Sequence, residues 1–463
     1  MRRTHTVAPA LAALTLATAV VGCSAPSALV PSAASAASDK SHSSARAMPP
    51  TALSLATSAA SATQAVGTLL VHRAAGLAAG DAAQWALGVA DPSSPPGKVQ
   101  LGAFDTLRAL GVREVTFSAV RELQTPEPAV PGVSAESPRR WSGTVQLSYR
   151  IPGVDRDDRV ALRTLQAVQQ GDQWRIVSWL GPTDTPEVFD LPDVQVRRAG
   201  HVLVVVSSAA APVALVSEAA ERAWQRVATV ADGIPDVVVV VPPTASVTAA
   251  MIGRSSPAGL EVVGATTIGQ RSAGKPAGAD RVVLGPDAAG RLTPEGRVVV
   301  LAHEFAHVAM RATTRSELPM WLSEGLAEHL AYRESGLDPR VVAAAAIDRA
   351  RISDWPTRLP VAGDFDTAET EFGTAYQVSW LAVRELAERR RGSAVVESAV
   401  WEAVHEVGGS LDSPAPADPT AALSAWLRSQ GTSESDLAAG VRRALMSWGS
   451  ERPGAGQTAM ASR

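Results

Sequence analysis

Three side chains in one short stretch, His303, Glu304 and His307, are of the types and at the spacing that could bind and use a metal ion. In an α-helix, residues four apart lie on the same face, so the two imidazoles can be offered to one ion. Glu304 follows the first imidazole, where its carboxylate can reach a water on that metal without binding the metal itself. The pattern therefore predicts a metal site with a general base.

A second stretch, residues 321–328, could complete such a site. A catalytic zinc site usually takes three protein ligands and keeps a fourth position open for water or substrate. Glu324 and Glu328 are four residues apart, so on a helix they lie on one face. The two stretches together predict a zinc site built from two helices.

The His-Glu-x-x-His motif at 303–307 and the Trp-x-x-Glu-Gly-x-Ala-Glu motif at 321–328 resemble those of the gluzincin branch of zinc metallopeptidases, the thermolysin-like or peptidase MA group. The resemblance covers roughly residues 200–390. It implies one Zn²⁺ per chain, Glu324 as the third ligand, and Glu328 as the acid that accepts a hydrogen bond from a ligand histidine and fixes its tautomer. It also implies that peptides or proteins are the substrates.

Other ligand sets fit the sequence less well. His329 as third ligand would lie about 140° around the helix from Glu324. A metzincin has Gly and His three and six positions after its second ligand, and those positions here are Met310 and Thr313. Asp338 is expected to cap a helix or to be solvated, as is Asp348.

The chemistry of such a site needs a base and an oxyanion donor. Glu304 would take a proton from water and pass it to the leaving amine. The tetrahedral intermediate needs a further hydrogen-bond donor, which in related enzymes is a Tyr or His. Tyr376, in the stretch 373–377, is our candidate; the alternative is a tyrosine packed on its helix with the hydroxyl at the surface. His405 is a second possibility that the spacing does not support.

The two motifs must be carried by helices joined by a short link. Thr293-Pro294-Glu295 is typical of a helix start, with a capping residue, a proline at the first position and an early acid. The residues that follow are apolar on nearly all sides, which indicates a buried helix. The link from about 312 to 318 must be tight.

A sheet must support these helices in a domain that we expect at 198–455. A valine-rich strand at 201–207, a helix at 215–230 and a buried strand at 237–241 form a β-α-β unit, which implies adjacent parallel strands and a right-handed crossover. Further strands are expected at 260–263 and 281–284. The resemblance implies that the last of these borders the cleft and pairs with extended substrate. The rest of the chain is expected to form a helical lobe.

An α+β fold is also expected for the preceding domain, at 61–195. A helical pattern around 66–77 comes first, and period-2 alternation at 144–151 then indicates a half-buried strand. A helix followed by antiparallel strands resembles the NTF2-like cone. Residues 23–60 are rich in Ser, Ala and Pro and are expected to form a flexible tether.

The first 22 residues have the pattern of a bacterial lipoprotein signal. Two arginines precede an apolar run at 7–21, too short to span a bilayer, and Val-Val-Gly-Cys ends at Cys23, the single cysteine of the chain. We expect export and a lipid anchor at Cys23 on the outer face of the cytoplasmic membrane; the alternative is an ordinary signal with an incidental cysteine. A net charge of −4 gives no indication of a nucleic-acid partner.

Three functions compete at this point. The leading one is a surface peptidase. The second is a catalytically inactive metallopeptidase fold that binds zinc and acts as a binding module; the third is a structural lipoprotein with a coincidental motif. An inactive relative is expected to have lost Glu304 or a ligand, and all are present in this sequence. The sequence carries no signal for the oligomeric state.

Overall fold

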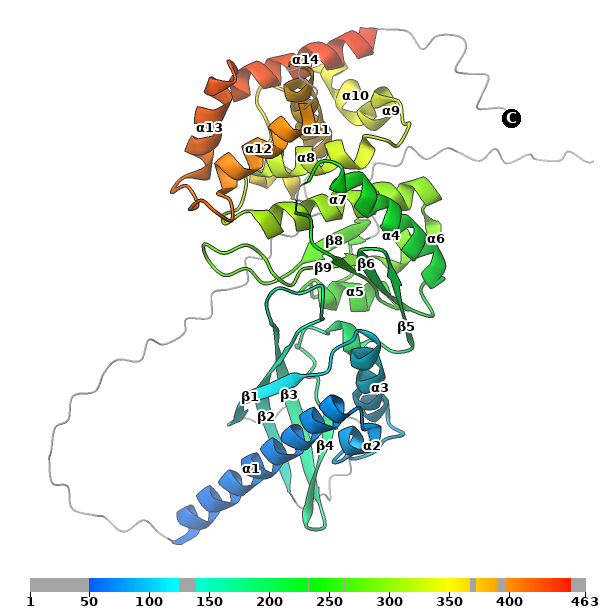
Figure 1. Cartoon of the computed structure of the whole chain (residues 1–463), viewed down its shortest axis with the longest axis vertical. Coiled ribbons are helices and arrows are strands. Elements are labelled where there is room, and N and C mark those ends of the chain that lie inside the picture. The colour runs from blue at the N-terminus through cyan, green and yellow to red at the C-terminus, as the bar shows by residue number, and fades with distance from the viewer. Residues whose placement is uncertain are drawn as a thin grey trace, which may run out of the picture. The chain divides into compact units, whose positions relative to one another are not determined.

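The structure of the protein is a computed structural model (Figure 1). It contains two β-sheets and many helices, in agreement with the predicted α+β class. The described residues are 50–124, 139–231, 233–260, 263–366, 372–389 and 396–450; the side chains of 50–61, 372 and 396–399 are excluded. They fall into two compact units that divide near residue 197, with 249–255 assigned to the first unit. Cys23 and the predicted signal lie outside the described residues.

The first unit contains three helices and an antiparallel sheet. The helices are α1 (Pro50–Ala79), α2 (Ala82–Ala86) and α3 (Pro95–Ala109). The sheet has the order β1-β2-β3-β4, from the strands β1 (Val115–Glu122), β2 (Arg140–Tyr149), β3 (Arg159–Gln170) and β4 (Gln173–Ser178). A short 3₁₀ helix, η1 (Val188–Asp190), follows. Every pairing is antiparallel, and alternate β2 side chains such as Val145 and Leu147 are buried, as the period-2 pattern predicts.

The boundary of the predicted tether is wrong by about ten residues. Helix α1 begins at Pro50, inside the range 23–60 that composition assigned to a flexible segment. The segment 51–60 contains several Ala and two Leu, which favour helix. A composition that cannot build a core can still extend a helix whose later turns are held by buried side chains, here Val66, Leu70 and Leu77.

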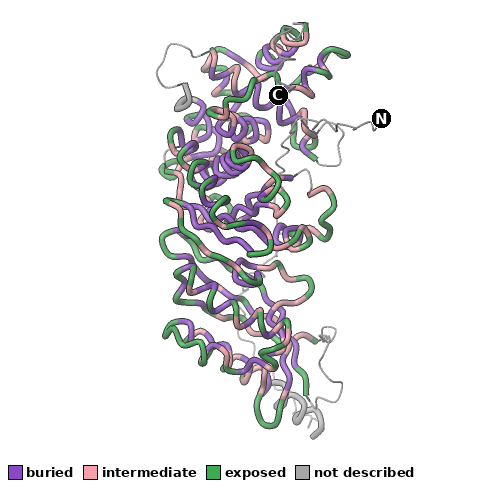
Figure 2. The backbone as a smooth tube through the Cα atoms, turned by 90° about the vertical axis from the view of Figure 1, so that its right-hand side faces the viewer, coloured by how far each residue is buried: buried purple, intermediate pink, exposed green. Residues whose placement is uncertain are grey.

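The sheet of the second unit has the order β5-β6-β7-β9-β8. Its strands are β5 (Val194–Ala199), β6 (Val202–Ser207), β7 (Val237–Val241), β8 (Ala265–Ile268) and β9 (Arg281–Leu284). Helix α4 (Val213–Ala228) joins β6 to β7, and these strands pair in parallel, which confirms the predicted β-α-β unit. Strand β9 pairs in parallel with β7 and antiparallel with β8, and β6 to β9 are buried along their lengths (Figure 2).

Of the strand predicted at 260–263, residues 261 and 262 lie outside the described residues. Leu260 and Val263 are connected by a turn hydrogen bond, and the described strand, β8, begins at Ala265. Their apolar side chains pack instead in a small cluster with Phe365 and Tyr376. A short apolar run indicates burial, but its periodicity does not distinguish a strand from other buried chain.

The remaining elements of the chain are helices, and all of them except the last three residues of α5 belong to the second unit. They are α5 (Ala245–Met251), α6 (Pro286–Arg291), α7 (Pro294–Thr313), α8 (Met320–Tyr332), α9 (Pro339–Val342), α10 (Ala344–Ile352), the 3₁₀ helix η3 (Ala362–Phe365), α11 (Phe372–Arg389), α12 (Val396–Gly408), α13 (Pro419–Ser429) and α14 (Glu434–Ser450). Helix α7 packs against α4, β8 and α8, and α8 packs against α11. Within the described part of the chain, no helix combines the length and apolar character needed to cross a membrane.

Candidate metal site

The two motif helices form where the sequence predicts them. Helix α7 starts after Thr293, whose hydroxyl accepts a hydrogen bond from the Gly296 amide at 3.0 Å, with Pro294 at the first helical position. Only residues 314–319 separate α7 from α8, so the link is tight as expected. Because α7 is buried on nearly all sides, the core fixes its position and therefore the direction of its polar side chains.

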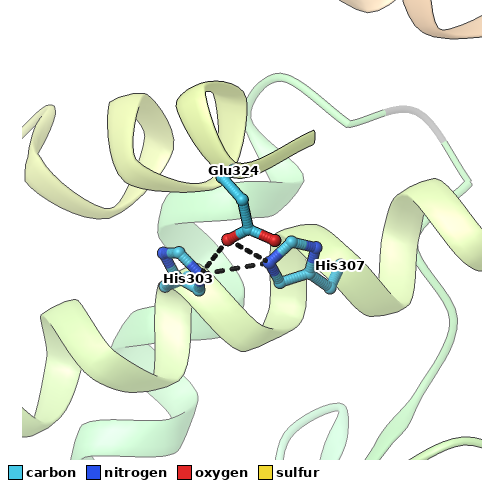
Figure 3. A group of neighbouring side chains, drawn as sticks. All are labelled: His303, His307 and Glu324. Carbon is cyan, nitrogen blue, oxygen red and sulfur yellow. Dashed lines mark hydrogen bonds and ion pairs between the residues drawn. The ribbon is translucent and has the colours of Figure 1, made fainter. Parts of the chain in front are cut away.

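His303, His307 and Glu324 converge on one point between α7 and α8 (Figure 3). The two Nε2 atoms are 3.0 Å apart, and Glu324 Oε2 lies 3.3 Å from Nε2 of His303 and 3.4 Å from Nε2 of His307. Ligands that bind zinc tetrahedrally at about 2.0–2.1 Å lie about 3.3–3.4 Å from one another. The three side chains are thus close to the spacing that a single zinc ion requires.

The chemistry of this cluster also fits a cation. Glu324 is fully buried, and neither of its carboxylate oxygens has a hydrogen-bond donor among the described residues apart from the two imidazoles. A buried carboxylate is costly unless a positive charge compensates it. Two imidazole nitrogens and one carboxylate oxygen form a donor set that zinc accepts.

The pKa shifts of the metal-free cluster also favour a bound cation. Burial alone lowers the pKa of His303, but the carboxylates of Glu324 and Glu328 outweigh it and raise that pKa to about 10. Burial alone raises the pKa of Glu324, but the two imidazoles outweigh it and lower that pKa to about 2. The cluster therefore favours a positive charge at its centre, which a proton supplies in the metal-free protein and a metal ion can supply in its place.

Each imidazole has a second polar neighbour on its other nitrogen. Glu328 Oε1 lies 3.4 Å from Nδ1 of His303, and Ser323 Oγ lies 3.3 Å from Nδ1 of His307. These contacts direct both Nε2 atoms toward Glu324. Glu328 was expected from the sequence. Ser323 was not, although its position directly before Glu324 places it on the same helical turn.

Glu304 lies beside the cluster without joining it. Its side chain is fully buried, and Oε2 accepts a hydrogen bond of 2.7 Å from the hydroxyl of Thr267 on β8. The other oxygen, Oε1, has no hydrogen-bond partner among the described residues. Burial raises the pKa of Glu304, and the nearby imidazoles oppose this without reversing it. A carboxylate of this kind is suited to accept a proton at neutral pH.

Tyr376 also lies at the site. Its ring centroid is 6.2 Å from that of His303 and 5.2 Å from that of Phe365. The side chain is buried, so the alternative of a hydroxyl at the surface does not hold. The ring therefore borders the candidate metal ligands from a third helix, α11.

Helix α11 comes close to the site because α8 contains a glycine at the contact. A Cβ atom at Gly325 would lie 2.3 Å from the carbonyl oxygen of Ser379, a distance that real contacts do not reach. Ser379 is three residues after Tyr376 and Gly325 directly follows Glu324, so this close approach brings together the helical turns that carry Tyr376 and Glu324. The sequence motif contains this glycine but gives no sign of the helix that it contacts.

The remaining polar candidates lie elsewhere. His329 is not part of the cluster of His303, His307 and Glu324. Asp338 caps α9 by accepting a hydrogen bond from the Arg340 amide, and Asp348 pairs with Arg351 at an exposed position. The ring of His405 contacts Trp401 edge-on in the helical lobe.

Comparisons with protein-family models, with characterised proteins and with solved structures found no match to this chain. The case for the site therefore rests on the sequence motifs and the geometry described above.

Proposed function

We propose that the protein is a zinc-dependent peptidase of the gluzincin type that hydrolyses peptide bonds outside the cytoplasmic membrane. The observation that carries the proposal is the convergence of His303, His307 and Glu324 at 3.0–3.4 Å, with the carboxylate of Glu304 beside them. The three side chains would hold one Zn²⁺. The proposed domain is gluzincin-like, and its mixed sheet, motif helices and helical lobe support this.

The roles of the residues follow from their chemistry. A zinc ion held by these residues would supply Lewis acidity for a water and for the scissile carbonyl. Glu304 accepts the proton of the attacking water on Oε1, which has no hydrogen-bond partner among the described residues, and passes it to the leaving amine. The hydroxyl of Tyr376 donates a hydrogen bond to the oxygen that becomes negative in the transition state. Glu328 and Ser323 orient the imidazoles.

The strand expected to pair with substrate cannot do so. Strand β9 is hydrogen-bonded to β7 on one side and β8 on the other, so it has no free edge for a peptide. A proline at Val283 would disrupt the sheet rather than only substrate binding, because this residue pairs with Thr266 and packs in the core. The last strand at this side of the sheet is β8, and we assign peptide pairing to it.

A zinc-binding protein without turnover is the second candidate, and one observation favours it. The side chains of the cluster are almost fully buried, and so are all four residues of β8. A peptide that reached the site would have to displace the side chains that cover it. This burial is compatible with a site that binds a metal and does not turn over substrate.

The experiment that separates the two candidates is a cleavage assay. The zinc-loaded protein and its Glu304→Gln variant are each incubated with a mixture of unstructured peptides, and new peptide termini are identified by mass spectrometry. A peptidase gives new termini with the wild type alone. No new termini with either protein, at full zinc occupancy, would favour the binding module.

For the first unit, we propose an NTF2-like cone. Three helices that precede a four-stranded antiparallel sheet in sequential order support it. A crystal structure of the protein in which this sheet were flat and did not curve around the helices would contradict this assignment.

We propose further that Cys23 carries a lipid that anchors the protein. The expected result is that the wild type is found in the membrane fraction of the bacterial cell and that a Cys23→Ser variant is not, because the variant lacks the thiol to which the lipid is attached. Immunoblots of the separated fractions measure this. A wild-type protein found entirely in the soluble fraction would contradict the anchor.

A further inference from the structure

We infer that Thr267 is a positioning residue for Glu304: its hydroxyl holds Oε2 of the carboxylate and so presents Oε1 to the attacking water. This inference deepens the proposed function and rests on it. Thr267 belongs to neither motif and lies 37 residues before Glu304 in the chain.

The contact is short, buried and directional. Thr267 Oγ1 lies 2.7 Å from Glu304 Oε2, and both side chains are buried. A hydroxyl has one proton to donate, and the main-chain oxygen of Glu304, at 3.3 Å, is the more distant acceptor. The two carboxylate oxygens therefore differ: Oε2 is bonded, and Oε1 is without a partner among the described residues.

This difference matters because a glutamate side chain has several rotatable bonds. Removal of a hydrogen bond to one oxygen lets the carboxylate turn, and a base that is displaced by about 1 Å can lose about 10²-fold in rate. Thr267 acts through Glu304 and need not touch substrate or metal.

The strand that carries Thr267 is itself held firmly. Thr267 pairs with Val282 in the antiparallel β8–β9 ladder. Two residues later the chain is clamped to the end of α7, because Arg311 binds Asp280 at 2.8 and 3.1 Å and also contacts the carbonyl of Gly269. A Cβ atom at Gly269 would lie 1.7 Å from Asp280 Oδ1, so a larger residue there would break this clamp. Strand β9 therefore holds β8 along its length, and Arg311 of helix α7 holds the chain directly after β8.

The first test is a pair of substitutions. Thr267→Val keeps the shape and removes the hydroxyl, and Thr267→Ser keeps the hydroxyl. We expect kcat to fall by about 10- to 100-fold in the valine variant and to return to within about threefold of the wild type in the serine variant, with KM and zinc content unchanged. In a Glu304→Gln background the valine substitution should have little further effect, because the base that it positions is already lost.

The second test needs no turnover. In the metal-free full-length protein, Thr267→Val should lower the urea midpoint of unfolding, because it leaves Oε2 of a buried carboxylate unpaired. In a Glu304→Met background the same substitution should not lower it. Equal shifts in both backgrounds would show that the hydroxyl does not bond Glu304, and this would overturn the inference.

Different results would overturn the peptidase function and the role of Thr267. A zinc-loaded wild type that cleaves no peptide overturns the proposed function and, with it, the role of Thr267 in positioning a base. An active wild type with an equally active Thr267→Val variant overturns the role of Thr267 alone. A serine variant as slow as the valine variant would also overturn it, since the hydroxyl would then not be what matters.

Discussion

Replacement of Glu304 by Gln is expected to lower kcat by about 10²- to 10⁴-fold, the usual contribution of a positioned general base. Glutamine has nearly the same shape and can keep the contact with Thr267, but it cannot accept the proton of the attacking water. Zinc content should not change, because the atoms that converge on the metal position belong to His303, His307 and Glu324. Initial rates and zinc per chain, measured on the same preparation, test both statements.

A matched control is available on the same helix. Glu295 lies in the first turn of α7 and pairs with Arg226 and Arg222, away from His303, His307 and Glu324. Glu295→Gln should leave kcat at the wild-type value. Full turnover in the Glu304→Gln variant would contradict the role of Glu304 as general base. A loss of zinc in that variant would show that Glu304 is a metal ligand.

Replacement of Tyr376 by Phe is expected to lower kcat by about 10²- to 10³-fold, as the loss of one oxyanion donor does in other hydrolases. The packing of the ring against Phe365 and His303 is retained, so the fold should persist. KM should change little, because the hydrogen bond forms to charge that develops in the transition state. Steady-state kinetics of the purified variant separate the two parameters.

The other tyrosine of this unit supplies the comparison. Tyr332 ends helix α8 and its ring packs on Trp380 at 5.8 Å. Tyr332→Phe should turn over at close to the wild-type rate. An unaltered kcat in Tyr376→Phe would show that the Tyr376 side chain only packs at the site. Another residue would then have to donate the hydrogen bond to the oxyanion.

The elements that carry the motifs could be predicted because local chemistry determines them. The cap at Thr293, the proline after it and the apolar residues of α7 specify one buried helix, and four-residue spacing then places His303 and His307 on one face. The strands β6 and β7 could also be predicted, because their valine-rich sequences are apolar throughout, as in a strand that is covered on both faces.

What could not be predicted depends on contacts between elements distant in sequence. Thr267 reaches Glu304 only because β8 lies beside α7, and nothing at position 267 indicates that neighbour. Gly325 matters only because Ser379 comes within contact distance. The substrate strand was misassigned for the same reason: the sequence locates β9, but only the sheet order shows that both its edges are paired. Position in a sheet is a tertiary property that strand patterns do not encode.

Zinc content tests the central claim most directly. The protein without residues 1–49 and its His303→Ala variant are purified, supplied with zinc, dialysed and measured by elemental analysis, with circular dichroism to confirm that both are folded. The structure predicts about one zinc per wild-type chain and none in the variant, since loss of one ligand opens the three-ligand set. A folded wild type without zinc would contradict the metal site and the peptidase together, and equal zinc in both proteins would place the metal elsewhere.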